Sequence, residues 1–154
     1  MDVELSYFDQ ENTLQRKSLR DITANRTAVL VGVPGAFTPT CTEKHAPAFV
    51  ELADELKAAG ADLVAIVAVN DPFVMRAWGH ELGAAGRVLM LADGSADFAR
   101  AAGIELDLSD KGLGVRMRRF ALVADNGVVT DLHLENGGAL KESTAERILK
   151  DLRD

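Results

Sequence analysis

Two apolar runs with a helix-like segment between them form the first clear pattern in the chain. Residues 28–33 (AVLVGV) and 62–69 (DLVAIVAV) are aliphatic and β-branched, which predicts strands buried on both faces of a sheet. Apolar residues of segment 46–60 recur at helical spacing, and Gly60 is placed to end a helix there. Pro47 is expected to bend this helix or to begin its regular part. The order predicts a strand–helix–strand unit.

A second helix and a third strand are predicted next. Asp71 can cap a helix whose first position is Pro72. Residues 87–93 (RVLMLAD) predict a strand, and residues 95–103 predict a short helix that ends at a glycine. Segment 104–117 is interrupted by glycines, so its pattern leaves its structure open.

The C-terminal third carries the strongest local signals. Residues 119–135 predict two strands that meet at Asn126-Gly127, a pair that accepts the positive φ angles of a tight hairpin. The sequence Ser-Thr-Ala-Glu at 143–146 matches a capping box that would open a final helix over 144–153.

The N-terminal residues alternate more loosely between apolar and polar positions. Residues 3–8 and 13–19 predict short strands around the turn-like sequence at 9–12. We therefore expect residues 1–154 to form one α/β domain, a mixed central sheet with helices on both faces and thioredoxin-like topology. In such sheets the ligand site lies beyond the carboxyl ends of strands, where segment 34–41 is expected.

Composition and charge narrow the function classes. The chain has 154 residues, of which 47% are hydrophobic and 27% charged, as in ordinary globular domains. Its formal net charge of −7 disfavours nucleic acid and anionic lipid surfaces as partners. The first ten residues lack a basic or apolar leader pattern, and no apolar run is long enough to span a bilayer, so a cytoplasmic protein is expected.

Cys41 is the only cysteine and lies where a strand should lead into a helix. An unpaired cysteine is commonly a small buried apolar residue, but the positive end of a helix favours a reactive thiolate. The hydroxyl of Thr38 could hold a small oxygen substrate against the sulfur or could cap the helix. Pro34 and Pro39 would stiffen the loop, or serve as ordinary turn residues.

Other cysteine and metal chemistries do not fit the spacing. A cysteine phosphatase loop needs an arginine about six residues after the cysteine, where this chain has Pro47. A papain-like pair needs a histidine base, and His45, one helical turn beyond Cys41, is expected to be a solvated or packed helix residue. The three histidines are scattered, so a zinc or iron site is not expected.

Pro34, Thr38 and Cys41 reproduce the PxxxTxxC signature of the peroxiredoxins. Segments 32–51, 69–79 and 118–129 resemble the subgroup that includes the plant type II and the mammalian mitochondrial and peroxisomal forms. The resemblance implies a thioredoxin-type fold and a thiol peroxidase that needs no cofactor.

The same resemblance implies a role for each matching residue. Cys41 would be the peroxidatic cysteine, which attacks a hydroperoxide to give a sulfenic acid and water or an alcohol. Thr38 would bind the peroxide, and Pro34 would shield the sulfur. Gly35 and Thr40 would contribute shape and backbone donors to the same loop.

One of three neighbouring arginines is selected by the family pattern. Arg119, just before the FALV strand, matches the distant arginine that steadies the thiolate and the transition state, with Arg118 as the second choice. Strand periodicity places Arg116 with Arg118 on one face and Arg119 with Met117 on the other.

The cysteine count and one helix suggest the partners. Because no second cysteine is present, an external thiol is expected to resolve the sulfenic acid: glutathione with glutaredoxin, or thioredoxin. The resemblance implies a homodimer in which Phe73 and Trp78 are interfacial, although both also suit a core. Two other functions stay open, a redox-sensing or chaperone-like binding protein that signals through Cys41 oxidation and a thioredoxin-fold module with an inert cysteine.

Overall fold

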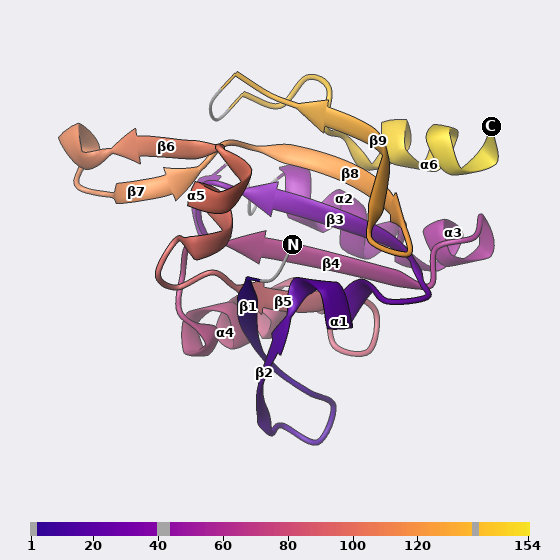
Figure 1. The fold of residues 1–154 in the computed structure, drawn as a ribbon, viewed down its shortest axis with the longest axis horizontal. Helices are drawn as coiled ribbons and strands as arrows, with labels where there is room; N and C mark the ends of the chain where they lie inside the picture. The colour runs from indigo at the N-terminus through magenta and orange to yellow at the C-terminus, as the bar shows by residue number, and fades with distance from the viewer. Residues whose placement is uncertain (1–2, 40–43, 137–138) are drawn as a thin grey trace.

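A seven-stranded mixed sheet forms the centre of the molecule (Figure 1). The computed structural model describes residues 3–39, 44–136 and 139–154. In spatial order the strands are β2 (Leu14–Ser18), β1 (Glu4–Phe8), β5 (Leu89–Ala92), β4 (Leu63–Ala68), β3 (Thr27–Val33), β8 (Phe120–Asp125) and β9 (Val128–Leu134). β3, β4 and β5 run parallel, whereas β1 and β8 pair antiparallel with β5 and β3 on either side. The predicted mixed α/β architecture is confirmed.

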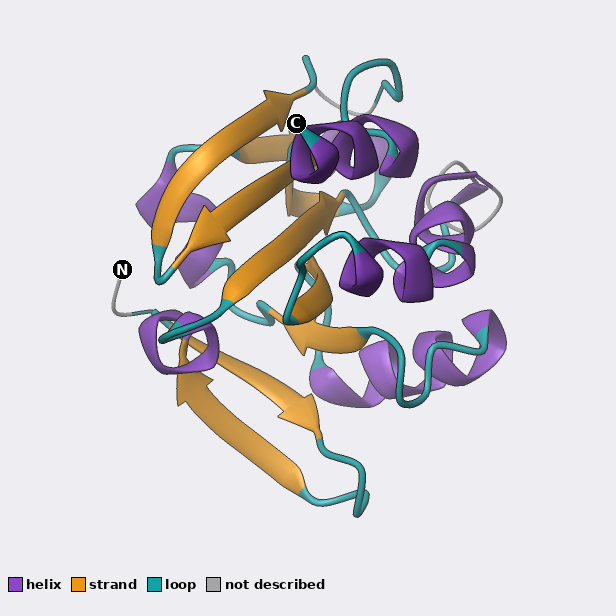
Figure 2. Cartoon of the chain, turned by 90° about the vertical axis from the view of Figure 1, so that its right-hand side faces the viewer, coloured by secondary structure: helices purple, strands orange, loops and turns teal. Residues whose placement is uncertain are grey.

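Helices cover both faces of this sheet, as predicted (Figure 2). One face carries α2 (Ala46–Glu51), α3 (Ala53–Ala58), α4 (Pro72–Leu82) and α6 (Ala145–Arg153). The short helices α1 (Leu19–Thr23) and α5 (Asp97–Ala102) lie over the other face. The alternation of β3 explains the two layers, because Val31 packs into the core of the first face and Leu30 into that of the second.

The helix predicted over 46–60 is divided into α2 and α3 at Leu52, whose φ and ψ are −92° and 6°. The hydrogen bonds from Leu52 N to Ala48 O and from Leu56 N to Leu52 O continue across the division, both at 2.9 Å. The segment is therefore one distorted helix, and Pro47 lies in its first turn as predicted.

The hairpin predicted at Asn126-Gly127 is confirmed. Asn126 and Gly127 have φ angles of 49° and 80°, the left-handed values that a two-residue turn requires at both positions. The turn joins β8 to β9 in antiparallel register.

The capping box predicted for the last helix is wrong by one residue. Thr144 is the N-cap of α6, and its hydroxyl accepts a hydrogen bond from Arg147 N at 3.2 Å. Ser143 is completely buried and its hydroxyl instead donates to Glu135 Oε2 at 2.8 Å. A long-range partner has replaced the local one, which a local pattern does not reveal.

The segments with weaker patterns are resolved as follows. The predicted N-terminal strands form the hairpin β1–β2, and α1 follows directly, capped by Ser18. The segment left open at 104–117 forms a small antiparallel sheet of β6 (Glu105–Leu108) and β7 (Gly114–Met117) around the 3₁₀ turn η2 (Ser109–Lys111). In the described residues no helix is both long and apolar enough to cross a membrane.

Candidate active site

The loop at residues 34–39 follows the carboxyl end of β3, where the sequence placed the site. The neighbouring strand β4 runs parallel and ends at the same edge, so Asn70 just beyond it reaches the loop. Its Oδ1 accepts a hydrogen bond from Ala36 N at 2.9 Å. Thr40 and Cys41 lie outside the described residues.

Thr38 is half-buried in this loop. Its hydroxyl donates to the carbonyl of Gly35 at 2.7 Å. The hydroxyl proton is therefore committed to the loop, while the lone pairs of the same oxygen can accept a hydrogen bond from a substrate O–H group.

Pro34 and Gly35 are both buried beneath the side chain of Arg116 from β7. Arg116 Nε donates to Leu113 O at 2.8 Å, and Nη1 donates to Pro34 O at 3.4 Å. A Cβ added to Gly35 would lie 2.6 Å from Arg116 Nη1. Glycine at this position thus allows the guanidinium to close over the loop.

Phe37 stands out in the loop because it has a φ of 64°, a left-handed value uncommon for a side chain of its size. Phe37 is 51% exposed, and the centroid of its ring lies 6.4 Å from that of Trp78. Trp78 itself is fully buried, which corrects the expectation that it lies at an interface and favours its reading as core. Phe73 remains 58% exposed and contacts Phe8.

Arg119 is only 2% exposed, whereas Arg116 and Arg118 are half-buried. Its Nη1 lies 2.8 Å from Nδ1 of His45. A guanidinium can only donate, so Nδ1 accepts and the imidazole proton must sit on Nε2. Nε2 donates in turn to the carbonyl of Ser143 at 2.5 Å.

The environment of His45 keeps its ring neutral. Burial and the positive charge of Arg119 lower the pKa of His45 from 6.5 to about 4. The ring also packs edge-on against Phe49, with centroids 5.4 Å apart. The contact joins Arg119 of the β7–β8 connection to a residue that follows Cys41 by four positions in the chain.

Glu135 anchors the other side of the same network and is 3% exposed. Its Oε2 accepts hydrogen bonds from the backbone amides of Lys141, Glu142 and Ser143 and from the Ser143 hydroxyl, all within 2.7–2.8 Å. Burial raises the pKa of this carboxyl, but these hydrogen bonds together outweigh it and hold the pKa below its ordinary value.

The backbone of Glu135 ties the network to the two neighbouring arginines. Its N–H donates to Arg119 O at 2.9 Å, and its carbonyl accepts from Arg118 Nε at 3.0 Å. Among the described residues no buried side-chain nitrogen or oxygen lacks a hydrogen-bond partner, so this polar cluster is satisfied despite its depth.

Sequence reasoning missed several of these residues. His45 was expected to be solvated or simply packed, and Glu135 and Asn70 were not selected. Asn70 could have been found, because a polar residue directly after a buried strand lies at the site edge of the sheet. Glu135 could not, since its partners at 141–143 show no pattern that pairs them with the end of β9.

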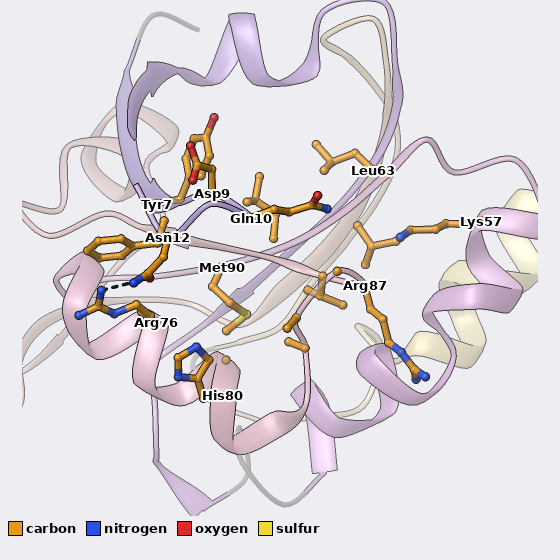
Figure 3. A pocket seen from close by; sticks show the side chains of 18 of the residues that line it. Tyr7, Asp9, Gln10, Asn12, Lys57, Leu63, Arg76, His80, Arg87 and Met90 are labelled. Atoms are coloured by element: carbon orange, nitrogen blue, oxygen red, sulfur yellow. Dashed lines mark hydrogen bonds between the residues drawn. The ribbon is translucent and has the colours of Figure 1, made fainter. Parts of the chain in front are cut away.

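The described residues contain no group of three or more histidine, cysteine, aspartate or glutamate side chains placed to hold a metal ion. Away from the loop at 34–39, the described residues line a hollow of about 390 Å³ (Figure 3). It lies at the amino-terminal ends of β4 and β5, the edge opposite to the loop at 34–39. Charged side chains including Lys57 and Arg87 surround it, and Arg76 donates to Asn12 Oδ1 at 3.3 Å.

A family model, curated relatives and a solved structure all match this chain to the same family of proteins. Residues 4–149 match the family model described as Redoxin. The chloroplastic peroxiredoxin-2E-2 of rice is 56% identical over 98% of this chain and 69% of its own, and the rice peroxiredoxin-2C is 51% identical over 98% and 93%. The crystal structure of reduced Prx3 from Vibrio vulnificus with H2O2 superposes with a TM-score of 0.93 at 45% identity, covering 99% of this chain and 94% of that one. The predicted thioredoxin-like fold class is confirmed.

The expected cytoplasmic location is corrected by these relatives. The rice relative at 56% identity is named as chloroplastic, which contradicts a cytoplasmic location as the expectation for this kind of chain. The expectation failed because receptors recognise targeting segments to set a protein's location, and the pattern of a folded domain does not encode that location.

Proposed function

The chain belongs to the peroxiredoxin family and is a thiol-dependent peroxidase, and from this premise we propose that Cys41 is its peroxidatic residue. The thiolate sulfur attacks one oxygen of the hydroperoxide and the O–O bond breaks. The sulfur is oxidised by two electrons to a sulfenic acid. The departing oxygen takes up a proton and leaves as water or as an alcohol.

The residues around the loop have complementary roles in this proposal. Arg119 stabilises the thiolate and the negative charge that develops on the leaving oxygen. The Thr38 oxygen accepts a hydrogen bond from the attacked peroxide, since its own proton is held by Gly35. Pro34 and Gly35 form the buried base of the loop, and Thr40 contributes backbone donors.

One observation carries the proposal, the contact between buried Arg119 and His45. A buried guanidinium has a strong electrostatic effect on nearby groups because little water screens it. Through His45 this charge is held at a residue only four positions after Cys41 in the chain. A positive charge near a cysteine favours its ionised form over the neutral one.

We further propose that an external thiol closes the cycle. It attacks the sulfenic acid to form a mixed disulfide with Cys41 and one water molecule. A second external thiol then attacks this mixed disulfide, which releases the Cys41 thiol and a disulfide of the two external thiols. Glutathione with glutaredoxin, or thioredoxin, would supply these electrons, since the sequence offers no second cysteine. Turnover measured separately with each reductant distinguishes the two.

The remaining proposals concern assembly. The continuous family match over residues 4–149 supports a single domain. A homodimer is supported by the apolar rings exposed on one side of α4, where Phe73 packs on Phe8 and Arg76 lies 4.0 Å from the Phe8 ring centroid. Sedimentation of wild-type protein beside Phe73→Asp tests this surface.

Rapid mixing with peroxide tests the proposed chemistry. Trp78 is the only tryptophan and contacts Phe37 of the loop, so its fluorescence should report the oxidation of Cys41. We expect a second-order rate far above that of free cysteine, and none for Cys41→Ser. A wild-type rate no faster than that of free cysteine contradicts the proposal.

A further inference from the structure

A line of hydrogen bonds joins the end of β9 to the buried arginine. It starts at Glu135, whose carboxylate gathers the amides of residues 141–143. It continues through the Ser143 carbonyl to His45 and ends at Arg119. Of these groups, only Arg119 has a direct role in the peroxide chemistry proposed above.

The first step of this line fixes a turn of backbone. Ser143 gives both its amide and its hydroxyl to Glu135 Oε2, at 2.8 Å each. Hydrogen bonds to an ionised acceptor are about twice as strong as those between neutral groups. The carbonyl of Ser143 is therefore held in one place, although it lies in a connection between β9 and α6 and not in a helix or strand.

The second step fixes the direction of an imidazole. The Ser143 carbonyl can only accept, so it keeps the proton of His45 on Nε2 and leaves Nδ1 as an acceptor. Nδ1 is the atom that Arg119 Nη1 contacts. With the proton on Nδ1 instead, two N–H groups would point at each other.

We propose that Glu135 is a positioning residue for the catalytic arginine, acting through Ser143 and His45. Arg119 has several rotatable bonds, and its guanidinium must be correctly placed when negative charge develops on the leaving oxygen in the transition state. A directed acceptor on Nη1 removes part of that freedom. This inference rests on the proposed role of Arg119.

A substitution that preserves shape tests the first step. Glu135→Gln keeps the volume but removes the charge that gathers the amides, and Glu142→Gln is the matched control. Glu142 lies within the turn at 141–143, but its carboxylate is half-exposed and pairs with Arg147 at 3.2 Å. We expect Glu135→Gln to slow the first oxidation about tenfold, and Glu142→Gln to change it less than about twofold.

A double-mutant cycle shows whether the effect passes through Arg119. If Glu135 acts by positioning that side chain, Glu135→Gln should change the rate less than about twofold once Arg119→Met is present. A purely structural role predicts the same tenfold loss in both backgrounds. Urea midpoints of all variants show whether each is folded under the assay conditions.

Two changes at His45 test the middle of the line even if Glu135→Gln does not fold. His45→Gln offers an amide oxygen to Arg119 and an N–H to Ser143, so it should keep the rate within roughly threefold. His45→Leu fills the space without either bond and should lose roughly ten- to 100-fold. Nitrogen NMR of the wild-type imidazole should show the proton on Nε2.

The outcomes separate this inference from the proposal beneath it. A slow wild type, or an Arg119→Met variant as fast as wild type, overturns the peroxidase roles themselves. If Arg119→Met is slow but Glu135→Gln equals Glu142→Gln, or the losses are additive, the positioning role alone is wrong. Equal rates for His45→Gln and His45→Leu would also overturn it.

Discussion

Polar side chains are buried at one end of the parallel strands and exposed to solvent at the other end. At the carboxyl ends of the parallel strands, Arg119, His45 and Glu135 are almost completely buried and joined by short hydrogen bonds. At the amino ends, a hollow of about 390 Å³ is surrounded by exposed side chains such as Lys57 and Arg87. This hollow therefore does not lie at the end of the strands where the polar side chains are fixed.

The difference follows from the energetics of burial. A charged group removed from water must be held by well-directed partners, so its position is defined to within a hydrogen bond. A solvated charge has no such requirement and interacts weakly with its neighbours. Buried polar residues with complete sets of partners therefore mark a functional edge better than volume does.

The largest expected effect is at the buried arginine. Arg119→Met should reduce the second-order rate of Cys41 oxidation by about 100- to 1000-fold, because it removes a charge that stabilises the transition state. The same change at the other edge, Arg87→Met, should leave the rate within about twofold. Stopped-flow fluorescence with hydrogen peroxide measures both. Similar rates for the two variants would remove the distinction between the edges.

The second effect is on stability and depends on pH. His45 has a folded pKa of about 4, below its unfolded value of 6.5, so the unfolded chain binds more protons in this range. The free energy of unfolding should therefore fall as pH decreases through this window, by about 2 kcal/mol between about pH 7 and about pH 5.

Urea unfolding at the two pH values measures this loss. The charged groups that face His45 are Arg119 and Glu135, and the lowered pKa of Glu135 places its own titration below the window. His45→Gln should be nearly free of the loss, whereas His80→Gln, an exposed control, should retain it. An equal loss in His45→Gln and wild type would show that another group is responsible.

A smaller effect is expected where the loop is closest to β7. In Gly35→Ala the new Cβ would meet Arg116 Nη1 at 2.6 Å, but a flexible side chain can move aside. We expect a loss of about 1 kcal/mol in stability and a few-fold slower oxidation, because Arg116 leaves the Pro34 carbonyl. In an Arg116→Ala background the same substitution should change stability by less than about 0.5 kcal/mol. Equal losses in both backgrounds would place the strain elsewhere.

The sequence predicted local features and missed contacts between distant segments. β3, β4 and the Asn126-Gly127 turn were predicted because their conformations depend on residues within a few positions. Thr38 was singled out by its position three residues before Cys41, whereas Arg119 was selected only by resemblance to a family. The wrong cap at Ser143 and the overlooked His45 have one cause, because both side chains form hydrogen bonds outside their local segment. The partner of Ser143 is 8 positions away in the chain, and Arg119 is 74 positions from His45. Local spacing does not show which buried polar groups will meet.

The smallest expected effect comes from reversing charge around the open hollow. Lys57→Glu with Arg87→Glu changes the formal charge at that edge by four units, yet both side chains are exposed and far along the strands from the loop. Hydrogen peroxide is neutral, so long-range steering does not act on its approach. The oxidation rate should stay within about twofold and the stability within about 0.5 kcal/mol. A tenfold lower oxidation rate for this double variant, at unchanged stability, would mean that the two ends of the parallel strands are coupled. Burial of polar residues alone would then not identify the functional end.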